Sequence, residues 1–146
     1  MNLKTTTGAL KTLLLTFASI ISTDVKELSE NLHNKAVRLI KKLKLPSKAK
    51  FFTTQEDLGE LIGEIKKDPP EVIIANVATG GVENLILEVF ERTKVPMILI
   101  ANDKSNSLAA ALEIRAYLRE RGIDIPLLFH VDFEKNFLKS LIRTLK

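Results

Sequence analysis

The chain has 146 residues and a formal net charge of +4, and it contains no cysteine. A chain of this length fits a single domain, residues 1–146, which needs neither a disulfide nor a metal to fold. The lack of cysteine excludes disulfides, thiolate catalysis and cysteine-ligated zinc, and we expect a cytoplasmic protein because this composition suits a reducing compartment.

The first apolar run, Thr12–Ile21, follows two lysines and therefore resembles part of a signal peptide. However, Ile20 and Ile21 occupy the positions where a cleavage site needs small residues, and the run is too short to span a bilayer. We therefore predict no signal peptide and no membrane segment. Residues 1–10 are predicted to form an N-terminal tail, and Thr12–Ser19 the first strand.

Five strands alternate with five helices in the predicted order of elements. The predicted strands are Thr12–Ser19, Ala49–Thr53, Glu71–Val77, Pro96–Ala101 and Ile125–Val131. The first predicted helix is capped by Ser22 or Thr23, and the second begins at Thr54 or Gln55. The third follows the third strand and ends at about Arg92, and the fourth follows the fourth strand and ends at about Arg121. The last predicted helix is Phe133–Leu145. Gly122 with Ile123 is typical of a helix C-terminus.

This alternation predicts the α/β class, with a parallel sheet covered by helices on both faces. We expect a three-layer αβα sandwich with five parallel strands in the flavodoxin-like order 2-1-3-4-5. In such open sheets, ligands bind outside the carboxyl ends of the strands. The loops after the third and fourth strands therefore mark the place to look for a site.

These two loops carry most of the residues that we predict to contact a ligand. Glycine at the first loop permits a positive φ and close approach of the backbone to a ligand, although two glycines can also simply form a tight turn. The second loop has six consecutive polar residues, Asn102–Ser107. The predicted ligand-binding residues are Thr79, Gly80, Gly81, Glu83, Asn102, Ser105, Asn106 and His130.

The glycine loop lacks the features of a nucleotide phosphate loop, since no Lys-Ser/Thr pair follows the glycines. Glu83 falls in the first turn of the next helix, where its charge offsets the partial positive charge that would attract a phosphate. A carboxylate there suits a neutral, hydroxyl-rich ligand, because carboxylates accept hydrogen bonds from hydroxyls. A helix-capping role for Glu83 is the alternative.

Two further pairs of residues at this edge have more than one interpretation. Ser105 or Asn106 is expected to cap the following helix. His130 and Asp132 are two apart at the end of the last strand, so alternation predicts that they lie on the same side. A metal or acid–base pair is conceivable there, but two ligands do not complete a metal site, and we predict none.

The basic residues have two interpretations. Lysines cluster at Lys41, Lys42, Lys44, Lys48 and Lys50. They could bind phosphate, or they could form a solvated helix end that complements the helix dipole. No aromatic residues are interleaved with them as a platform for bases, so nucleic acid is not the expected partner. The single glutamine and the abundant Lys and Glu favour a thermophilic source.

The segments Asn76-Val-Ala-Thr-Gly-Gly-Val-Glu83 and Asn106-Ser-Leu-Ala-Ala-Ala-Leu-Glu113 resemble the N-terminal domain of L-fucose and L-arabinose isomerase-like proteins. The resemblance is clearest over Glu71–His130 and implies a sugar ketol isomerase module that works with a divalent metal such as manganese. In that family, however, the metal-binding residues belong to domains that follow this one, so no cofactor is expected in this chain. The family's N-terminal domain also helps to form oligomers and lines a neighbouring subunit's pocket.

Three functional hypotheses follow. The first is a stand-alone isomerase-like domain that binds a small hydroxylated ligand, such as a sugar or a sugar derivative, without catalysis of its own. The second is a subunit of a metal-dependent ketol isomerase that is completed by a homo-oligomer or by a separately encoded catalytic chain, using Glu83, His130 and Asp132. The third is a nucleic-acid or protein interaction domain that uses the lysine cluster.

Overall fold

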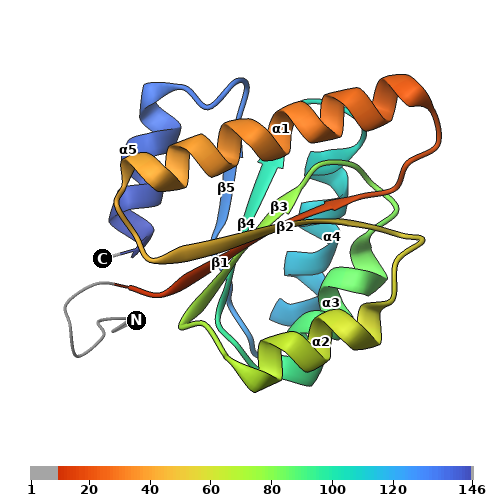
Figure 1. The fold of residues 1–146 in the computed structure, drawn as a ribbon, viewed down its shortest axis with the longest axis vertical. Coiled ribbons are helices and arrows are strands. Elements are labelled where there is room, and N and C mark those ends of the chain that lie inside the picture. The colour runs from red at the N-terminus through yellow and green to blue at the C-terminus, as the bar shows by residue number, and fades with distance from the viewer. Residues whose placement is uncertain (1–9, 146) are drawn as a thin grey trace.

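The fold was analysed in a computed structural model, which describes residues 10–145. Five helices enclose one sheet (Figure 1). The strands are β1 (Thr12–Ala18), β2 (Ser47–Thr53), β3 (Val72–Val77), β4 (Met97–Asn102) and β5 (Leu127–His130). The helices are α1 (Thr23–Lys42), α2 (Leu58–Lys67), α3 (Glu83–Thr93), α4 (Ser107–Arg119) and α5 (Lys135–Leu145).

The sheet is entirely parallel, and its strands follow the order β2-β1-β3-β4-β5. Helices α1 and α5 cover one face, whereas α2, α3 and α4 cover the other (Figure 1). The predicted three-layer, flavodoxin-like fold is therefore confirmed. This topology places the loops that follow all five strands at one edge of the sheet, the carboxyl edge.

The core is divided by the sheet into two layers. Every residue of β3 and β4 is buried, as expected for central strands covered on both faces. Alternate residues sort to opposite sides: Phe17, Ile73 and Leu99 belong to the large cluster under α2, α3 and α4. Leu14 and Ile74 instead belong to a smaller cluster that includes α1 and α5 residues.

Most predicted element ends agree with the structure, and the start of the second helix is the clearest error. Ser22 caps α1 as expected, since its hydroxyl oxygen accepts the Val25 N–H at 3.3 Å. Helix α2 begins at Leu58, not at Thr54 or Gln55. The carboxylate of Asp57 is the cap that decides this boundary, because it accepts the Gly59 N–H at 2.9 Å.

The end of α4 has the predicted geometry. Gly122 has φ +79° and donates its N–H to Arg119 O at 3.0 Å, and the Ile123 N–H bonds Leu118 O at 2.9 Å. The following strand is shorter than predicted, because β5 covers only Leu127–His130.

The N-terminal tail prediction falls largely outside the described residues, which begin at Leu10. Leu10 itself is buried and packs with Val72 and Ile98. Among the described residues, no helix combines the length and apolar character needed to cross a membrane.

Candidate functional site

The predicted loops meet at the carboxyl edge of β3 and β4. The Gly80 N–H donates to Ser105 O at 2.7 Å, so the two loops are joined through their backbones. A Cβ on Gly80 would lie only 3.0 Å from the Asn106 Cβ. Glycine at this position therefore makes room for the neighbouring loop, and the structure brings Gly80, Ser105 and Asn106 together as expected.

Asn102 joins the same two loops from the end of β4. Its Nδ2 donates to Val77 O at 3.2 Å and to Ala78 O at 3.3 Å, and its Oδ1 accepts the Lys104 N–H at 2.8 Å. The Ser107 hydroxyl donates to Val77 O at 2.5 Å and accepts the Asn102 N–H at 2.9 Å. The side chains of Asn102 and Ser107 are buried, and their hydrogen bonds hold the loops in place.

Thr79 and Glu83 also bond to the chain around them. The Thr79 hydroxyl accepts the Ser19 N–H at 2.8 Å and donates to Gly80 O at 2.7 Å. The Glu83 carboxylate accepts the Gly81 N–H at 3.0 Å. This contact is the local, helix-start role that we gave as the alternative to ligand binding.

Asn106 occupies the N-cap position of α4, but its side chain makes no capping hydrogen bond. Both Asn106 and Ser105 have left-handed backbones, with φ +61° and +53°. The predicted position of the cap is therefore right for Asn106, whereas the predicted side-chain bond is absent.

His130 is a buried residue at the end of β5. Its ring stacks on Phe133, with centroids 3.8 Å apart, and its Nδ1 accepts the Phe133 N–H at 3.2 Å. Burial lowers the pKa of His130, which keeps the imidazole neutral. Its Nε2 is buried and has no partner in residues 10–145.

The expectation that His130 and Asp132 lie on the same side rested on strand alternation. Strand β5 ends at His130, so alternation does not extend to Asp132, whose φ is +123°. Asp132 instead pairs with Lys35 of α1 at 2.6 Å. Within the described part of the chain, no group of three or more His, Asp or Glu residues could hold a metal ion.

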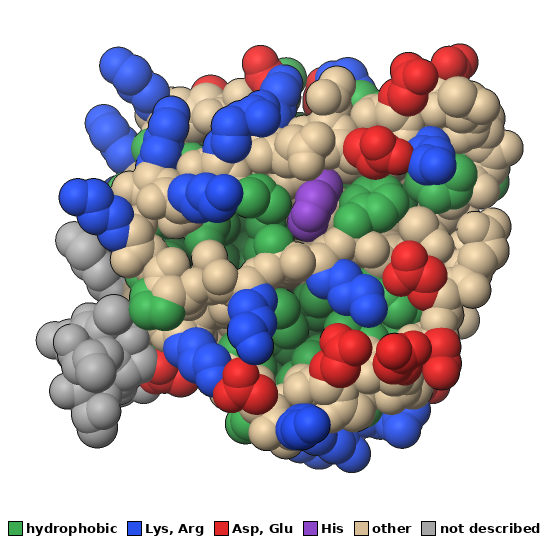
Figure 2. Space-filling model, viewed as in Figure 1, with side chains coloured by type: hydrophobic (Ala, Val, Ile, Leu, Met, Phe, Trp, Pro, Cys, Tyr) green, Lys and Arg blue, Asp and Glu red, His purple; other side chains and the backbone are tan. Residues whose placement is uncertain are grey.

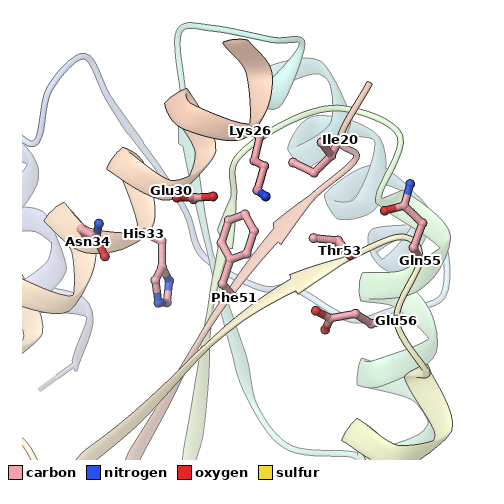
Figure 3. A pocket seen from close by; sticks show the side chains of 9 residues that line it. All are labelled: Ile20, Lys26, Glu30, His33, Asn34, Phe51, Thr53, Gln55 and Glu56. Atoms are coloured by element: carbon pink, nitrogen blue, oxygen red, sulfur yellow. The ribbon is translucent and has the colours of Figure 1, made fainter. Parts of the chain in front are cut away.

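A cavity of about 480 Å³ lies at the same carboxyl edge, where α1 passes over the ends of β1 and β2 (Figure 3). One wall is a face of α1, because Lys26, Glu30 and Asn34 follow one another at four-residue spacing and His33 lies three residues after Glu30. The other walls come from the ends of β1 and β2 and from the loop after β2. The lining residues are Ile20, Lys26, Glu30, His33, Asn34, Phe51, Thr53, Gln55 and Glu56.

The lining is chemically mixed and carries two carboxylates against one ammonium. Acidic side chains gather beyond the end of α1 that begins the helix, whereas basic side chains gather over its other end (Figure 2). The cavity uses α1 residues between positions 26 and 34 of a helix that runs from 23 to 42, and so lies nearer the acidic end. Its hydrogen-bonding groups suit an uncharged polar molecule, and its two carboxylates disfavour an anion.

Our sequence analysis missed this cavity. The available signal was the row Lys26, Glu30, His33 and Asn34, a polar stripe on an otherwise amphipathic helix. Such a stripe is typical of any solvated helix face. Only the crossing of α1 over Phe51 turns it into the wall of a cavity.

No family model matches the chain, and no curated protein matches it either. Solved structures with a similar fold include the following three. A GDP-L-fucose synthetase from Naegleria fowleri is 13% identical, with a TM-score of 0.47, and the match covers 84% of this chain and 50% of that chain. A putative lipoprotein fragment from Peptoclostridium difficile 630 is 17% identical, with a TM-score of 0.48 and coverage of 92% and 98%.

The third is a periplasmic ribose ABC transporter structure from Conexibacter woesei DSM 14684, 15% identical, with a TM-score of 0.42 and coverage of 88% and 57%. This chain thus spans half the length of the fucose synthetase chain. At TM-scores below 0.5 these likenesses carry no argument about function.

Proposed function

We propose that this chain binds a small, neutral, hydroxylated ligand, such as a sugar or a sugar derivative, at the carboxyl edge of its sheet, without catalysis of its own. The observation that supports the proposal is the cavity of about 480 Å³ under α1, whose lining mixes polar and apolar groups. Its volume lies in the usual range for small-molecule sites, about 300–1,000 Å³.

The side chains of the cavity match the chemistry of a polyhydroxylated molecule. Glu30 and Glu56 can accept hydrogen bonds from hydroxyls, and the amides of Asn34 and Gln55 can both donate and accept. The ring of Phe51 offers an apolar surface for the C–H groups of a sugar. A phosphate or carboxylate ligand would meet two acidic side chains, so we expect anionic ligands to bind more weakly.

The cavity adjoins the loops that the sequence singled out. Ser19 donates its N–H to Thr79, and the next residue, Ile20, lines the cavity. Direct ligand contacts by the predicted loop residues stay predictions, as do the relation to sugar isomerases, a metal-dependent catalytic partner chain, a homo-oligomer, a thermophilic source and a cytoplasmic location.

A thermal-shift screen tests the proposal. The probes are L-fucose, L-arabinose, D-ribose and their phosphorylated or acidic counterparts, each with and without Mn²⁺. A ligand at a hundred times its dissociation constant adds about 2.7 kcal/mol of stability, which raises the melting temperature visibly. We expect neutral sugars to raise it and their charged counterparts to raise it less.

Glu30→Gln provides the site variant and Glu27→Gln the matched control, because both residues are exposed on α1 and only Glu30 lines the cavity. The sugar-dependent shift should fall in Glu30→Gln and persist in Glu27→Gln. The proposal is wrong if no neutral sugar shifts the melting temperature, or if phosphorylated sugars give the larger shift.

A further inference from the structure

A row of buried polar side chains runs from the cavity into the sheet. The Thr16 hydroxyl oxygen lies 2.6 Å from Nδ1 of His33, and the Asn76 Nδ2 donates to the same oxygen at 3.2 Å. Thr16 and Asn76 are paired across β1 and β3, and both are completely buried. The row therefore links a cavity residue on α1 to the central strands.

The hydrogen bonds of this row favour one neutral tautomer of His33. Because the Thr16 oxygen accepts from Asn76, its own hydrogen is available to donate to Nδ1 of His33. A neutral imidazole that accepts at Nδ1 carries its hydrogen on Nε2. Burial lowers the pKa of His33, which favours this neutral form.

The other nitrogen of His33, Nε2, belongs to a ring that lines the cavity. Figure 3 shows His33 extending from α1 toward the sheet beside Phe51, and the two rings meet edge to face with centroids 5.7 Å apart. Within residues 10–145, no protein group is hydrogen-bonded to Nε2, although His33 lines the cavity. In the tautomer that accepts at Nδ1, the Nε2–H of His33 is thus a donor that a molecule in the cavity can use.

Packing alone does not account for the row. Among the described residues of this face, Leu14 and Ile74 are apolar and the buried Thr12 hydroxyl has no partner, whereas Thr16 and Asn76 bond to each other and, through Thr16, to His33. The Oδ1 of Asn76 is buried without a partner in the described residues, and leaving such an atom unpaired is unfavourable. Because this polar row is unfavourable to bury and ends at the cavity, a role in binding a ligand there explains it better than packing does.

We propose that His33 determines the specificity of the cavity by donating its Nε2–H to an acceptor oxygen of the ligand, and that Thr16 and Asn76 are positioning residues that hold this tautomer. The proposal rests on the proposed function, since it names the group that recognises the ligand. The acceptor is a carbonyl or hydroxyl oxygen. The charged groups that share the cavity are Lys26, Glu30 and Glu56.

The tautomer is tested first, without any ligand. Long-range ¹H–¹⁵N correlation spectra at neutral pH report which imidazole nitrogen is protonated. We expect the Nε2–H form to predominate in the wild type and to lose that predominance in Thr16→Val, which keeps the shape but removes the hydroxyl. Thr16→Ser should restore it. A predominant Nδ1–H form, or an unchanged spectrum in Thr16→Val, would overturn the positioning role.

Binding of L-fucose, L-arabinose and D-ribose is then measured by calorimetry. His33→Gln keeps an N–H donor near the position of Nε2, whereas His33→Phe keeps a ring of similar size without one. We expect affinity within a few-fold of wild type for His33→Gln and at least a tenfold loss for His33→Phe. Equal binding by His33→Phe would overturn this inference alone, whereas failure of the wild type to bind any sugar would overturn the proposed function and the donor role with it.

Discussion

At the scale of single residues, the glycine loop is shaped by contacts that a side chain would disturb. Gly81 has φ +80°, and a Cβ there would lie 3.2 Å from the Ser19 Cβ. The loop is thus confined from two directions, since Gly80 faces Asn106 just as closely. Conformation and space together explain why two successive glycines stand here.

Gly81→Ala tests this explanation, and Gly63→Ala is its matched control. A left-handed backbone costs a non-glycine residue about 1–3 kcal/mol, so Gly81→Ala should lower the free energy of unfolding by that amount. Gly63 lies within α2 with open space around it, so alanine there should raise stability by about 0.5–1 kcal/mol. Urea unfolding measures both, and a Gly81→Ala protein as stable as wild type would contradict the account.

At the scale of elements, β3 and β4 are coupled through a side chain rather than only through the sheet. Asn102 reaches back from the end of β4 to the carbonyls of Val77 and Ala78. Replacing it with alanine leaves these buried groups with fewer partners, and we expect Asn102→Ala to cost about 1–3 kcal/mol in urea unfolding. Asn84→Ala, on the exposed side of α3, should change stability by less than about 0.5 kcal/mol. Equal effects of the two substitutions would show that the coupling is unimportant.

The elements also show what a sequence can and cannot predict. Largely apolar runs such as Val72–Val77 and Met97–Asn102 belong to strands buried on both faces, so the parallel sheet was predictable. The strand order was predictable because it is a common one for five strand–helix units. The start of α2 was not, because Thr54 and Asp57 are both suitable caps and only the folded backbone selects between them.

The cavity could not be predicted for a different reason. Its walls join His33 to Phe51, which are distant in sequence and meet only where α1 crosses β2. Conversely, the predicted loop residues do gather at the carboxyl edge. Their hydrogen bonds to one another, such as those of Asn102, depend on geometry that no spacing reveals.

At the scale of the whole molecule, the folded structure favours the neutral form of both described histidines, so protonation at low pH destabilises the fold. Burial lowers the pKa of His33 and of His130 below the usual 6.5. The unfolded chain therefore binds more protons than the folded chain once the pH falls below about 6.5, and stability must decrease with falling pH in that range.

We expect the urea midpoint to be lower at pH 5 than at pH 7, and His33→Gln and His130→Gln each to reduce that difference. Glutamine removes the titrating group, so any stability lost by the substitution itself should be the same at both pH values. A second loss is expected at more acidic pH, since lysine partners lower the pKa of the exposed Asp68, Asp103 and Asp132 below 3.8. An unchanged pH dependence in both histidine variants would contradict this prediction.

The wall that α1 contributes to the cavity has a consequence for redesign. Lys26, Glu30, His33 and Asn34 lie on one helix face, whereas the buried side of that helix is formed by other residues, such as Leu32, Ala36 and Ile40. The exposed wall residues Lys26, Glu30 and Asn34 can therefore be exchanged while His33, the packing face and all five strands keep their residues. A library that varies only the exposed wall positions would sample new ligands on an unaltered scaffold, and natural divergence has the same route open to it.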